Sequence, residues 1–334
     1  MPLLRDGRPT SAQSMNDWCN KGIVGFTTAL WMGVLTACYA TEHDQAENPA
    51  PTDALAAAIA NNAQTSVVDL CKRVARKLAS VSYEDCAEAN FEHNELRSVE
   101  GSPILYKEYG VVENRKPQAR ILLIGGIHGD EYTSVSMVFQ WVRKLNEYHS
   151  GLFEWRVVPL LNPDGLLKSQ SQRTNANGVD LNRNFPTPNW DELSQRHWVK
   201  DTGRNPRRYP GTTPVSEPES KWLVDTIAQF KPDAIVSLHA PYGVLDFDGP
   251  RTSPPQRLGN LRLQLLGTYP GSLGNYAGVN NGIPVVTIEL PNAGTMPKGD
   301  QAARLWMDLV GWLKNNIVPQ DGQKVTAADQ AGPS

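Results

Sequence analysis

The sequence has no strong imbalance of charge and no segment that concentrates positive residues. Its 334 residues include 32 Lys and Arg against 35 Asp and Glu, which gives a formal net charge of −3 at pH 7. A domain that binds nucleic acid normally carries a basic patch, so we expect no nucleic-acid partner. The content of 40% hydrophobic and 20% charged residues is ordinary for a soluble globular protein.

Cysteine is scarce, with four residues in the whole chain. Cys71 and Cys86 do not have the spacing of a metal site built from cysteines. Cys71 and Cys86 lie beyond the N-terminal segment described next, and a pair of cysteines in an exported protein can form a disulfide. Such a bond would stabilise the fold by roughly 3 kcal/mol. Two buried thiols are an equally open alternative.

Long apolar runs are also missing, except at residues 22–37, which carry no charged side chain. This run is short for a membrane span but suits the core of a signal peptide. It ends in LTAC, residues 35–38, which resembles a bacterial lipobox, in which the cysteine is lipidated and becomes the mature N-terminus. We therefore expect a periplasmic protein that is lipid-anchored through Cys38. Cleavage after Ala40, or a retained segment in a cytoplasmic protein, are the alternatives.

Beyond this segment the pattern changes along the chain. Apolar residues between positions 67 and 81 recur with the period of an amphipathic helix. Further on, expected strands alternate with expected helices, which predicts an α/β fold with a mixed central sheet flanked by helices. The expected organisation is a signal peptide at 1–40, a polar linker at 41–53, a small helical segment at 54–95, a catalytic domain at 96–318 and a disordered tail at 319–334.

Hydrophobic periodicity places the elements of the catalytic domain. Residues 162–216 show little periodicity, and a loop of that length in a compact domain is usually functional. Strands are expected at 102–110, 120–126, 233–239 and 283–291 and from residue 153 onward, and helices at 131–147, 217–230 and 300–316.

Four side chains that can bind metal or move protons follow or end these strands. His128 follows the strand at 120–126 and Glu131 opens the next helix, while His239 and Glu289 end two further strands. Active sites in open α/β sheets gather at the carboxyl ends of strands. Two His and one Glu match a catalytic zinc site that keeps one position open for water. We therefore predict that His128, Glu131 and His239 bind one Zn²⁺ ion.

The neighbouring residues suit hydrolysis of an amide bond. Bound zinc lowers the pKa of its water towards ~7, and a separate carboxylate must accept the water proton and return it to the leaving amine. Glu289 is the candidate for this general base. Arg173 is expected to stabilise the oxyanion that develops on the attacked carbonyl. Asn182 and Arg183 are expected to hold a substrate carboxylate, which the planar guanidinium binds through two hydrogen bonds.

Several segments together resemble the zinc metallocarboxypeptidase family, and most closely its bacterial murein tripeptide amidase branch. The resemblance covers about residues 96–315 and implies a mixed central sheet between helices. It also implies that His128, Glu131 and His239 bind zinc, that Glu289 is the general base and that Arg173 stabilises the oxyanion. For Asn182 and Arg183 it implies recognition of a substrate carboxylate. The segments that carry it are GGIHGDE, LNPDG, RTNANGVDLNRNFP, SLHAP and TIELP.

The branch cleaves the γ-D-glutamyl–meso-diaminopimelate amide of peptidoglycan peptides, so the resemblance implies a zinc-dependent amidase or carboxypeptidase that acts on murein peptides. Many family members carry a tyrosine on the loop before the catalytic Glu. Tyr269 lies near that place but not in register with it, and we assign the role to Tyr269 with Tyr276 as its competitor. A monomer is the default expectation.

Three further interpretations stay open. The enzyme could be a carboxypeptidase for other peptides, or a deacylase resembling aspartoacylase and succinylglutamate desuccinylase, which share H-x-x-E and a distal His. The NPDG and DLNRNFP segments argue against the deacylase. A non-catalytic peptidoglycan-binding lipoprotein is the least favoured. Asp246 and Asp248 either meet the amine of diaminopimelate or, as we favour here, belong to a solvated loop.

Overall fold

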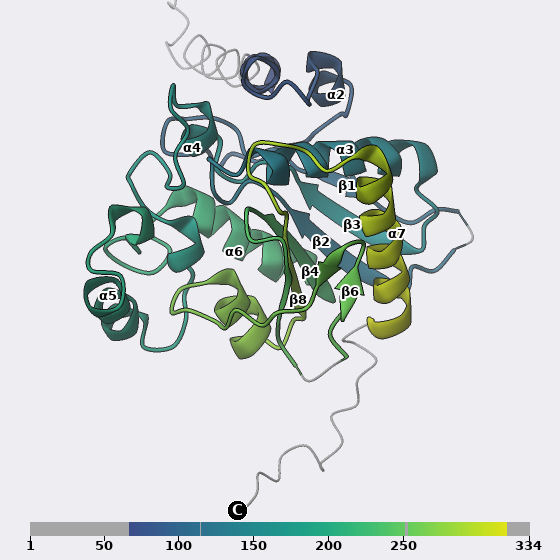
Figure 1. Ribbon diagram of the computed structural model, residues 1–334. Helices are drawn as coiled ribbons and strands as arrows, with labels where there is room; N and C mark the ends of the chain where they lie inside the picture. Colours follow the sequence, from purple (N-terminus) through teal and green to yellow (C-terminus); the bar gives the residue numbers. More distant parts are fainter. Residues whose placement is uncertain (1–66, 114, 251–252, 319–334) are drawn as a thin grey trace, which may run out of the picture. The chain divides into compact units, whose positions relative to one another are not determined.

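A six-stranded mixed sheet forms the centre of the computed structural model, which describes residues 67–113, 115–250 and 253–318 (Figure 1). Its four inner strands run parallel, and an antiparallel strand closes each edge. This architecture confirms the expected mixed sheet flanked by helices. In spatial order the strands are β1 Lys107–Tyr109, β3 Phe153–Val158, β2 Ala119–Ile124, β4 Ala234–His239, β8 Val285–Glu289 and β5 Leu245–Asp248.

The inner strands are central because their sequences are apolar on both faces. All six residues of β4 are buried, as are five of the six residues of β2. Near-continuous apolar runs of this kind are typical of parallel strands covered on both sides. The predicted strand at 102–110 is shorter than expected, because only Lys107–Tyr109 pair as β1 while the residues before it form isolated bridges.

Three long helices cover the two faces of the sheet (Figure 1). On one face α3 Tyr132–Tyr148 and α7 Gly299–Asn316 share a core that includes Trp141 and Leu309. On the other face α6 Pro218–Phe230 packs Trp222 against the sheet. All three helices lie within one residue of the predicted bounds.

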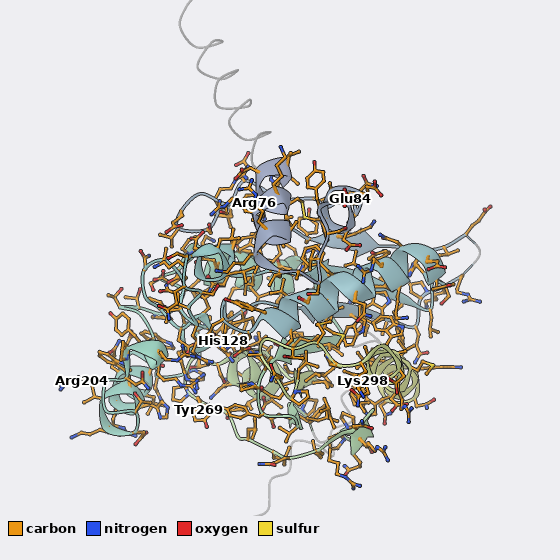
Figure 2. All side chains as sticks on the ribbon, turned by 45° about the horizontal axis from the view of Figure 1, so that its top comes forward. Arg76, Glu84, His128, Arg204, Tyr269 and Lys298 are labelled. Carbon is orange, nitrogen blue, oxygen red and sulfur yellow. A yellow bond between two sulfur atoms is a disulfide. The ribbon has the colours of Figure 1, made fainter. Side chains whose placement is uncertain are left out.

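A disulfide-linked helical piece packs on the outside of α3. Residues 67–77 are helical, α2 Tyr83–Ala87 follows, and Cys71 and Cys86 form a disulfide, which settles the alternative left open above. The apolar face of this piece contacts Phe139 and other residues of the main domain. Figure 2 shows Arg76 and Glu84 on it, above the ribbon that carries His128.

Two segments differ from the expected loops. Residues 162–216 contain short helices, among them the unpredicted α5 Trp190–Lys200. The expected solvated loop at Asp246 and Asp248 is wrong, because these residues belong to β5. In the sequence LDFD, Leu245 and Phe247 pack into the core while the two aspartates face a pocket. The remaining elements are α4 Pro163–Leu167, η1 Leu181–Arg183, η2 Pro206–Arg208, β6 Arg257–Leu258, β7 Leu261–Arg262 and η3 Gly274–Asn280.

Several expectations fall on residues that the structure does not describe. The chain divides into two units, Met1–Ala50 and Pro51–Ser334, and every described residue belongs to the second. The signal peptide, the lipobox at Cys38, the linker at 41–53 and the tail at 319–334 lie outside the described residues, and the domain boundaries stay predictions. In the described ranges, no helix is both long and apolar enough to cross a bilayer.

Candidate metal centre and active site

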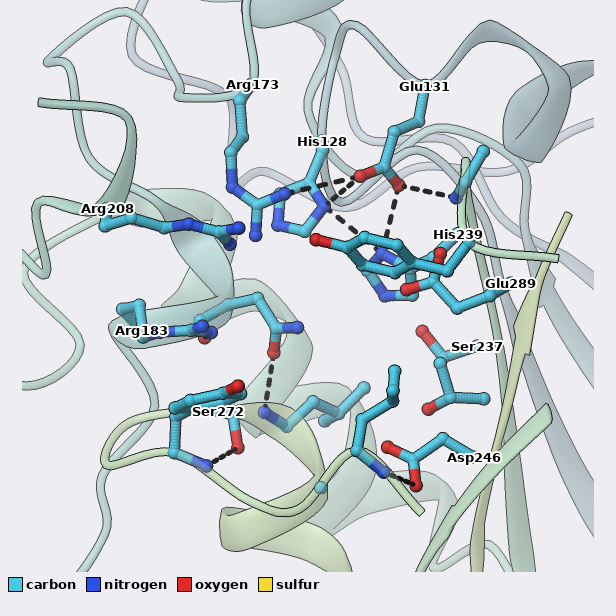
Figure 3. A pocket seen from close by; sticks show the side chains of 18 of the residues that line it. His128, Glu131, Arg173, Arg183, Arg208, Ser237, His239, Asp246, Ser272 and Glu289 are labelled. Atoms are coloured by element: carbon cyan, nitrogen blue, oxygen red, sulfur yellow. Dashed lines mark hydrogen bonds and ion pairs between the residues drawn. The ribbon is translucent and has the colours of Figure 1, made fainter. Parts of the chain in front are cut away.

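A pocket of about 570 Å³ opens at the carboxyl ends of β2, β4 and β8 (Figure 3). Parallel strands present their carboxyl ends at one edge of a sheet, which is why residues far apart in sequence meet there. Every residue predicted for the site lines this pocket: His128, Glu131, Arg173, Asn182, Arg183, His239, Tyr269 and Glu289.

The three predicted metal ligands converge and are buried. Nδ1 of His128 lies 2.8 Å from Oε1 of Glu131, and Nδ1 of His239 lies 3.0 Å from Oε2 of the same carboxylate. The two Nδ1 atoms lie 3.2 Å apart. Burial alone would raise the pKa of Glu131, but His128 and His239 hold this pKa well below its ordinary value. The carboxylate is therefore ionised and available as a ligand.

This donor set fits zinc. Ligand atoms about 2.1 Å from a tetrahedral zinc ion lie about 3.4 Å apart, close to the separations observed here. Neither of the facing Nδ1 atoms can be satisfied by the other unless one carries a proton, and a cation between them removes that conflict. Within the described part of the chain, His128, Glu131 and His239 are the one group of His, Cys, Asp and Glu side chains that converges in this way.

Glycine and asparagine fix the turn that presents His128. A Cβ atom on Gly129 would lie 2.2 Å from the carbonyl carbon of Gly165, so only glycine lets the turn approach α4 this closely. Asn162 caps α4 by accepting from the N–H of Gly165. The Asn162 amide also donates to the carbonyls of Ile127 and Arg173. The LNPDG motif thus shapes the site without contributing a reactive group.

Asp180 contacts both His128 and Arg173 in the candidate metal centre, and the sequence analysis did not identify it. Its carboxylate lies 3.1 Å from Nε2 of His128 and accepts from Nε of Arg173 at 2.9 Å. It is fully buried; burial would raise its pKa, but Arg173 and His128 hold the pKa well below its ordinary value. A carboxylate behind a ligand histidine fixes the tautomer and orientation of the ring. The available signal was its place in the motif VDLNRN.

Glu289 stands beside His239 in the paired strands β4 and β8. Its Oε2 atom is buried and has no hydrogen-bond partner among the described residues. Burial raises the pKa of Glu289, His239 lowers it and Glu131 adds to the rise. A carboxylate with an unpartnered oxygen and a raised pKa, facing a pocket, has the properties of a general base.

Asn182 and Arg183 line the pocket and also hold its wall. Oδ1 of Asn182 accepts from the N–H of Leu273, so this side chain ties η1 to the loop before η3. Arg183 is buried, and its Nε atom has no partner in the part of the chain that the structure describes. Burial lowers the pKa of Arg183 to about 10, although Asp180 opposes the shift. The guanidinium stays charged at neutral pH and can take a carboxylate.

The structure separates the two candidate tyrosines. The ring of Tyr269 lies over the Arg183 guanidinium, 4.4 Å from centroid to Cζ, and lines the pocket. Tyr276 instead stacks on Phe185 in the core. Tyr269 also contacts the ring of His197, with 5.3 Å between centroids. His197 thus lies at the pocket wall, where the unpredicted helix α5 brings it.

Arg208 is a second lining residue that sequence reasoning missed. Its Nη1 atom lies 3.8 Å from Oδ2 of Asp180, and its side chain is partly exposed. Figure 3 shows Arg173, Arg183 and Arg208 together on one side of the pocket. This side is therefore strongly cationic and suits anionic groups of a ligand.

Comparison with known proteins places the chain in a family. The profile of the zinc carboxypeptidase family matches residues 93–262, which include the three candidate metal ligands but not Glu289. Murein peptide amidase A of Vibrio campbellii is 33% identical over 202 residues, 58% of this chain and 77% of that protein. Murein peptide amidase A of Escherichia coli is 30% identical over 233 residues, 66% of this chain and 90% of that protein.

A solved structure agrees at the level of the fold. Bovine thrombin-activatable fibrinolysis inhibitor, in complex with tick carboxypeptidase inhibitor, superposes with a TM-score of 0.51 and 21% identity, over 67% of this chain and 88% of that chain. With the sheet, the buried His–Glu–His group and the family match in place, the chain belongs to the zinc carboxypeptidase family. It is an enzyme of the zinc metallocarboxypeptidase class.

Proposed function

We propose that the protein is a zinc-dependent murein peptide amidase that hydrolyses the γ-D-glutamyl–meso-diaminopimelate bond. The observation that carries the proposal is the convergence of His128, Glu131 and His239 with the unpartnered carboxylate oxygen of Glu289 in one pocket. The similarity to two murein peptide amidases, over 77% and 90% of their lengths, supports the substrate class.

Different side chains of the site carry out metal binding, proton transfer and stabilisation of the oxyanion. His128, Glu131 and His239 would hold one zinc ion, which when bound lowers the pKa of a water molecule and polarises the substrate carbonyl. Glu289 accepts the proton of the attacking water at Oε2 and returns it to the leaving amine. Arg173 keeps Nη2 free of hydrogen bonds to other described residues, and this N–H group donates to the developing oxyanion.

The cationic side of the pocket orients the substrate. Arg183 receives the carboxylate of the leaving residue through its unpartnered Nε and neighbouring N–H groups. Asn182 donates from its amide nitrogen, since its Oδ1 is already occupied by Leu273. Tyr269, stacked on Arg183, covers the bound residue. The carboxylate thus fixes the scissile amide beside Glu289.

The test is direct hydrolysis. The purified, zinc-loaded protein is given L-Ala-γ-D-Glu-meso-diaminopimelate, and free diaminopimelate is measured by mass spectrometry. Release by the native protein and not by Glu289→Gln is the expected result. Absence of release, with zinc confirmed bound, would contradict the murein assignment and direct the search to other peptides and N-acyl amino acids.

We also propose that the protein is exported to the periplasm and lipid-anchored at Cys38. The lipobox-like LTAC segment and the disulfide between Cys71 and Cys86 support this location, since disulfides persist in oxidising compartments. Cells fed a clickable palmitate analogue should label the native protein, and Cys38→Ala should lose the label. Labelling that is equal in both proteins would exclude the anchor.

A further inference from the structure

One face of α5 carries a stripe of polar and aromatic residues for which the proposed reaction has no role. Trp190, Ser194, His197 and Asp201 follow one another at intervals of three or four residues, so they share one side of the helix and its C-cap. Trp190 is 3% exposed, and His197 and Asp201 line the pocket. This face of α5 therefore lies against the active site although it is not apolar.

The first contact of this face is with the backbone of the arginine that is expected to bind carboxylate. Nε1 of Trp190 donates to the carbonyl of Arg183 at 2.9 Å. The loop at 263–273, between β7 and η3, approaches the same carbonyl at Gly271, where a Cβ atom would lie 1.9 Å from the oxygen. Helix α5, Arg183 and the end of this loop thus meet at one point.

The second contact is with the side chain of Tyr269, which the same loop carries. The Tyr269 ring lies 4.4 Å from Cζ of Arg183, and its centroid lies 5.3 Å from that of the His197 ring. The backbone N–H of Tyr269 donates to Oγ of Ser272, but its hydroxyl has no hydrogen-bond partner among the residues that the structure describes. The position of this ring over the guanidinium therefore depends on its contacts with Arg183 and His197.

Asp201 fixes the orientation of the His197 ring. Its Oδ2 atom accepts from Nδ1 of His197 at 2.7 Å, across one turn of chain at the end of α5. The side chain of His197 is 19% exposed, whereas that of Asp201 is 64% exposed. A carboxylate that accepts from one ring nitrogen sets the tautomer of the imidazole and limits its rotation. The ring of His197 is thereby presented to Tyr269 in one orientation.

We propose that His197 is a positioning residue, whose ring keeps Tyr269 stacked over Arg183. This inference rests on the proposed function, in which Arg183 takes the carboxylate of the leaving residue and Tyr269 covers that residue. A tyrosine that is already held in place loses less rotamer freedom when the substrate binds. His197 therefore strengthens substrate binding through Tyr269, without contact with the substrate, and leaves the chemical step unchanged.

Two variants separate the ring of His197 from its hydrogen bond. His197→Gln keeps a donor for Asp201 and removes the ring, whereas His197→Phe keeps a ring and removes the donor. With L-Ala-γ-D-Glu-meso-diaminopimelate as substrate, His197→Gln should raise KM by about 3- to 10-fold, the factor that an aromatic contact contributes, and leave kcat within about twofold. His197→Phe should keep the native KM. Arg196→Ala, at an exposed residue of the same helix, is the matched control and should leave both constants unchanged.

Nitration of Tyr269 reports the position of its ring without a substrate. Tetranitromethane modifies accessible tyrosine rings, and mass spectrometry of the peptides gives the rate at each tyrosine. Tyr148, which is 69% exposed and does not line the pocket, is the internal reference. Tyr269 is 39% exposed in the native protein, so its rate relative to Tyr148 should rise about twofold in His197→Gln, where the ring is released. In His197→Phe and Arg196→Ala this relative rate should stay native.

The outcomes separate the positioning role from the proposed function. A native KM in His197→Gln, a raised KM in His197→Phe, or a fall in kcat in place of a rise in KM overturns the positioning role and leaves the amidase function standing. If the native protein does not cleave the tripeptide, the amidase function is overturned and the nitration rates decide the positioning role. A rise at Tyr269 in His197→Gln alone supports the role, and equal rates in the native protein and His197→Gln overturn it.

Discussion

Asp180 is the residue on which the arrangement of the metal centre depends. It contacts a ligand histidine, the candidate oxyanion donor and, by accepting from the N–H of Asn182, the start of η1. The buried carboxylate of Asp180 therefore fixes the positions of His128, Arg173 and Asn182 relative to one another. Carboxylates in this position raise the basicity of the ligand histidine and limit its rotation.

Replacing Asp180 should weaken metal binding more than it weakens the fold. In Asp180→Asn, His128 loses its charged partner, and we expect the affinity for zinc to fall by about 10- to 100-fold. Competition with a fluorescent chelator measures the affinity, and Asp225→Asn, at a partly exposed carboxylate that pairs with Lys221 away from the pocket, serves as the control. An unchanged affinity in a folded variant would show that Asp180 does not position the ligand.

Glu219 should make stability depend on pH. It is fully buried and accepts from Nδ2 of Asn175 and the N–H of Val99, with the Asp164 carboxylate nearby. Burial raises its pKa from 4.5 to about 7 despite these hydrogen bonds. A raised carboxyl pKa means that the folded state binds the proton more tightly. Its stabilising contribution is therefore complete below pH 4.5 and lost as pH rises through about 7.

The matched variant tests this expectation. Between pH 4.5 and pH 7 the native protein should lose on the order of 3 kcal/mol of unfolding free energy through Glu219, a loss that Glu219→Gln avoids. Urea unfolding at pH 5 and pH 8 gives the change in unfolding free energy with pH for the native protein and for the variant. Glu113→Gln, at an exposed residue, should show the same change as the native protein. Identical pH dependence in native protein and Glu219→Gln would refute the assignment.

At the scale of elements, the disulfide should stabilise the helical piece and, with it, the outer side of α3. The bond joins residues 15 positions apart, and closing a loop of that size is worth about 3 kcal/mol. The double variant Cys71→Ala and Cys86→Ala should unfold at a lower denaturant concentration than the native protein, and added reductant should not change its unfolding curve. The native protein should shift towards the variant when reduced. Coincident unfolding curves under all conditions would exclude a stabilising role.

The elements predicted correctly are those whose burial follows a regular pattern. β2, β4 and β8 are apolar on both faces, and α3, α6 and α7 have one apolar face, so periodicity placed them. It failed for α5, which buries only Trp190 and Ser194 and therefore shows no apolar face. Periodicity failed for β5 because the polar positions of LDFD face a pocket instead of solvent. Local sequence does not distinguish a polar residue that faces a pocket from one that faces solvent.

The same reasoning explains which site residues were found. His128, Glu131, His239 and Glu289 each stand at the end of a predictable element, so their meeting point followed from the topology. Asp180 was missed because it does not end an element that periodicity predicts, and because its contact with His128 joins residues 52 positions apart in the sequence.

For the whole molecule, zinc should act as a stabilising ligand. Without a cation the facing Nδ1 atoms of His128 and His239 are poorly satisfied, so metal binds the folded state in preference to the unfolded one. At free zinc 100-fold above its dissociation constant, the gain is about 2.7 kcal/mol. Thermal unfolding of the chelator-treated protein should therefore shift upward when zinc is restored. Glu131→Gln should lose most of this shift; a full shift in that variant would place the metal elsewhere.

The position of β5 at the edge of the sheet has a consequence for how this enzyme can change. His239 and Glu289 come from the inner strands β4 and β8, whereas Asp246 and Asp248 come from the edge strand β5, and the register of β5 with β8 fixes how deep these two carboxylates lie in the pocket. Substitutions at Asp246 or Asp248 should therefore change the lining of the pocket without displacing the candidate metal ligands or Glu289. The groups proposed for hydrolysis and the residues that line this part of the pocket can therefore be varied independently.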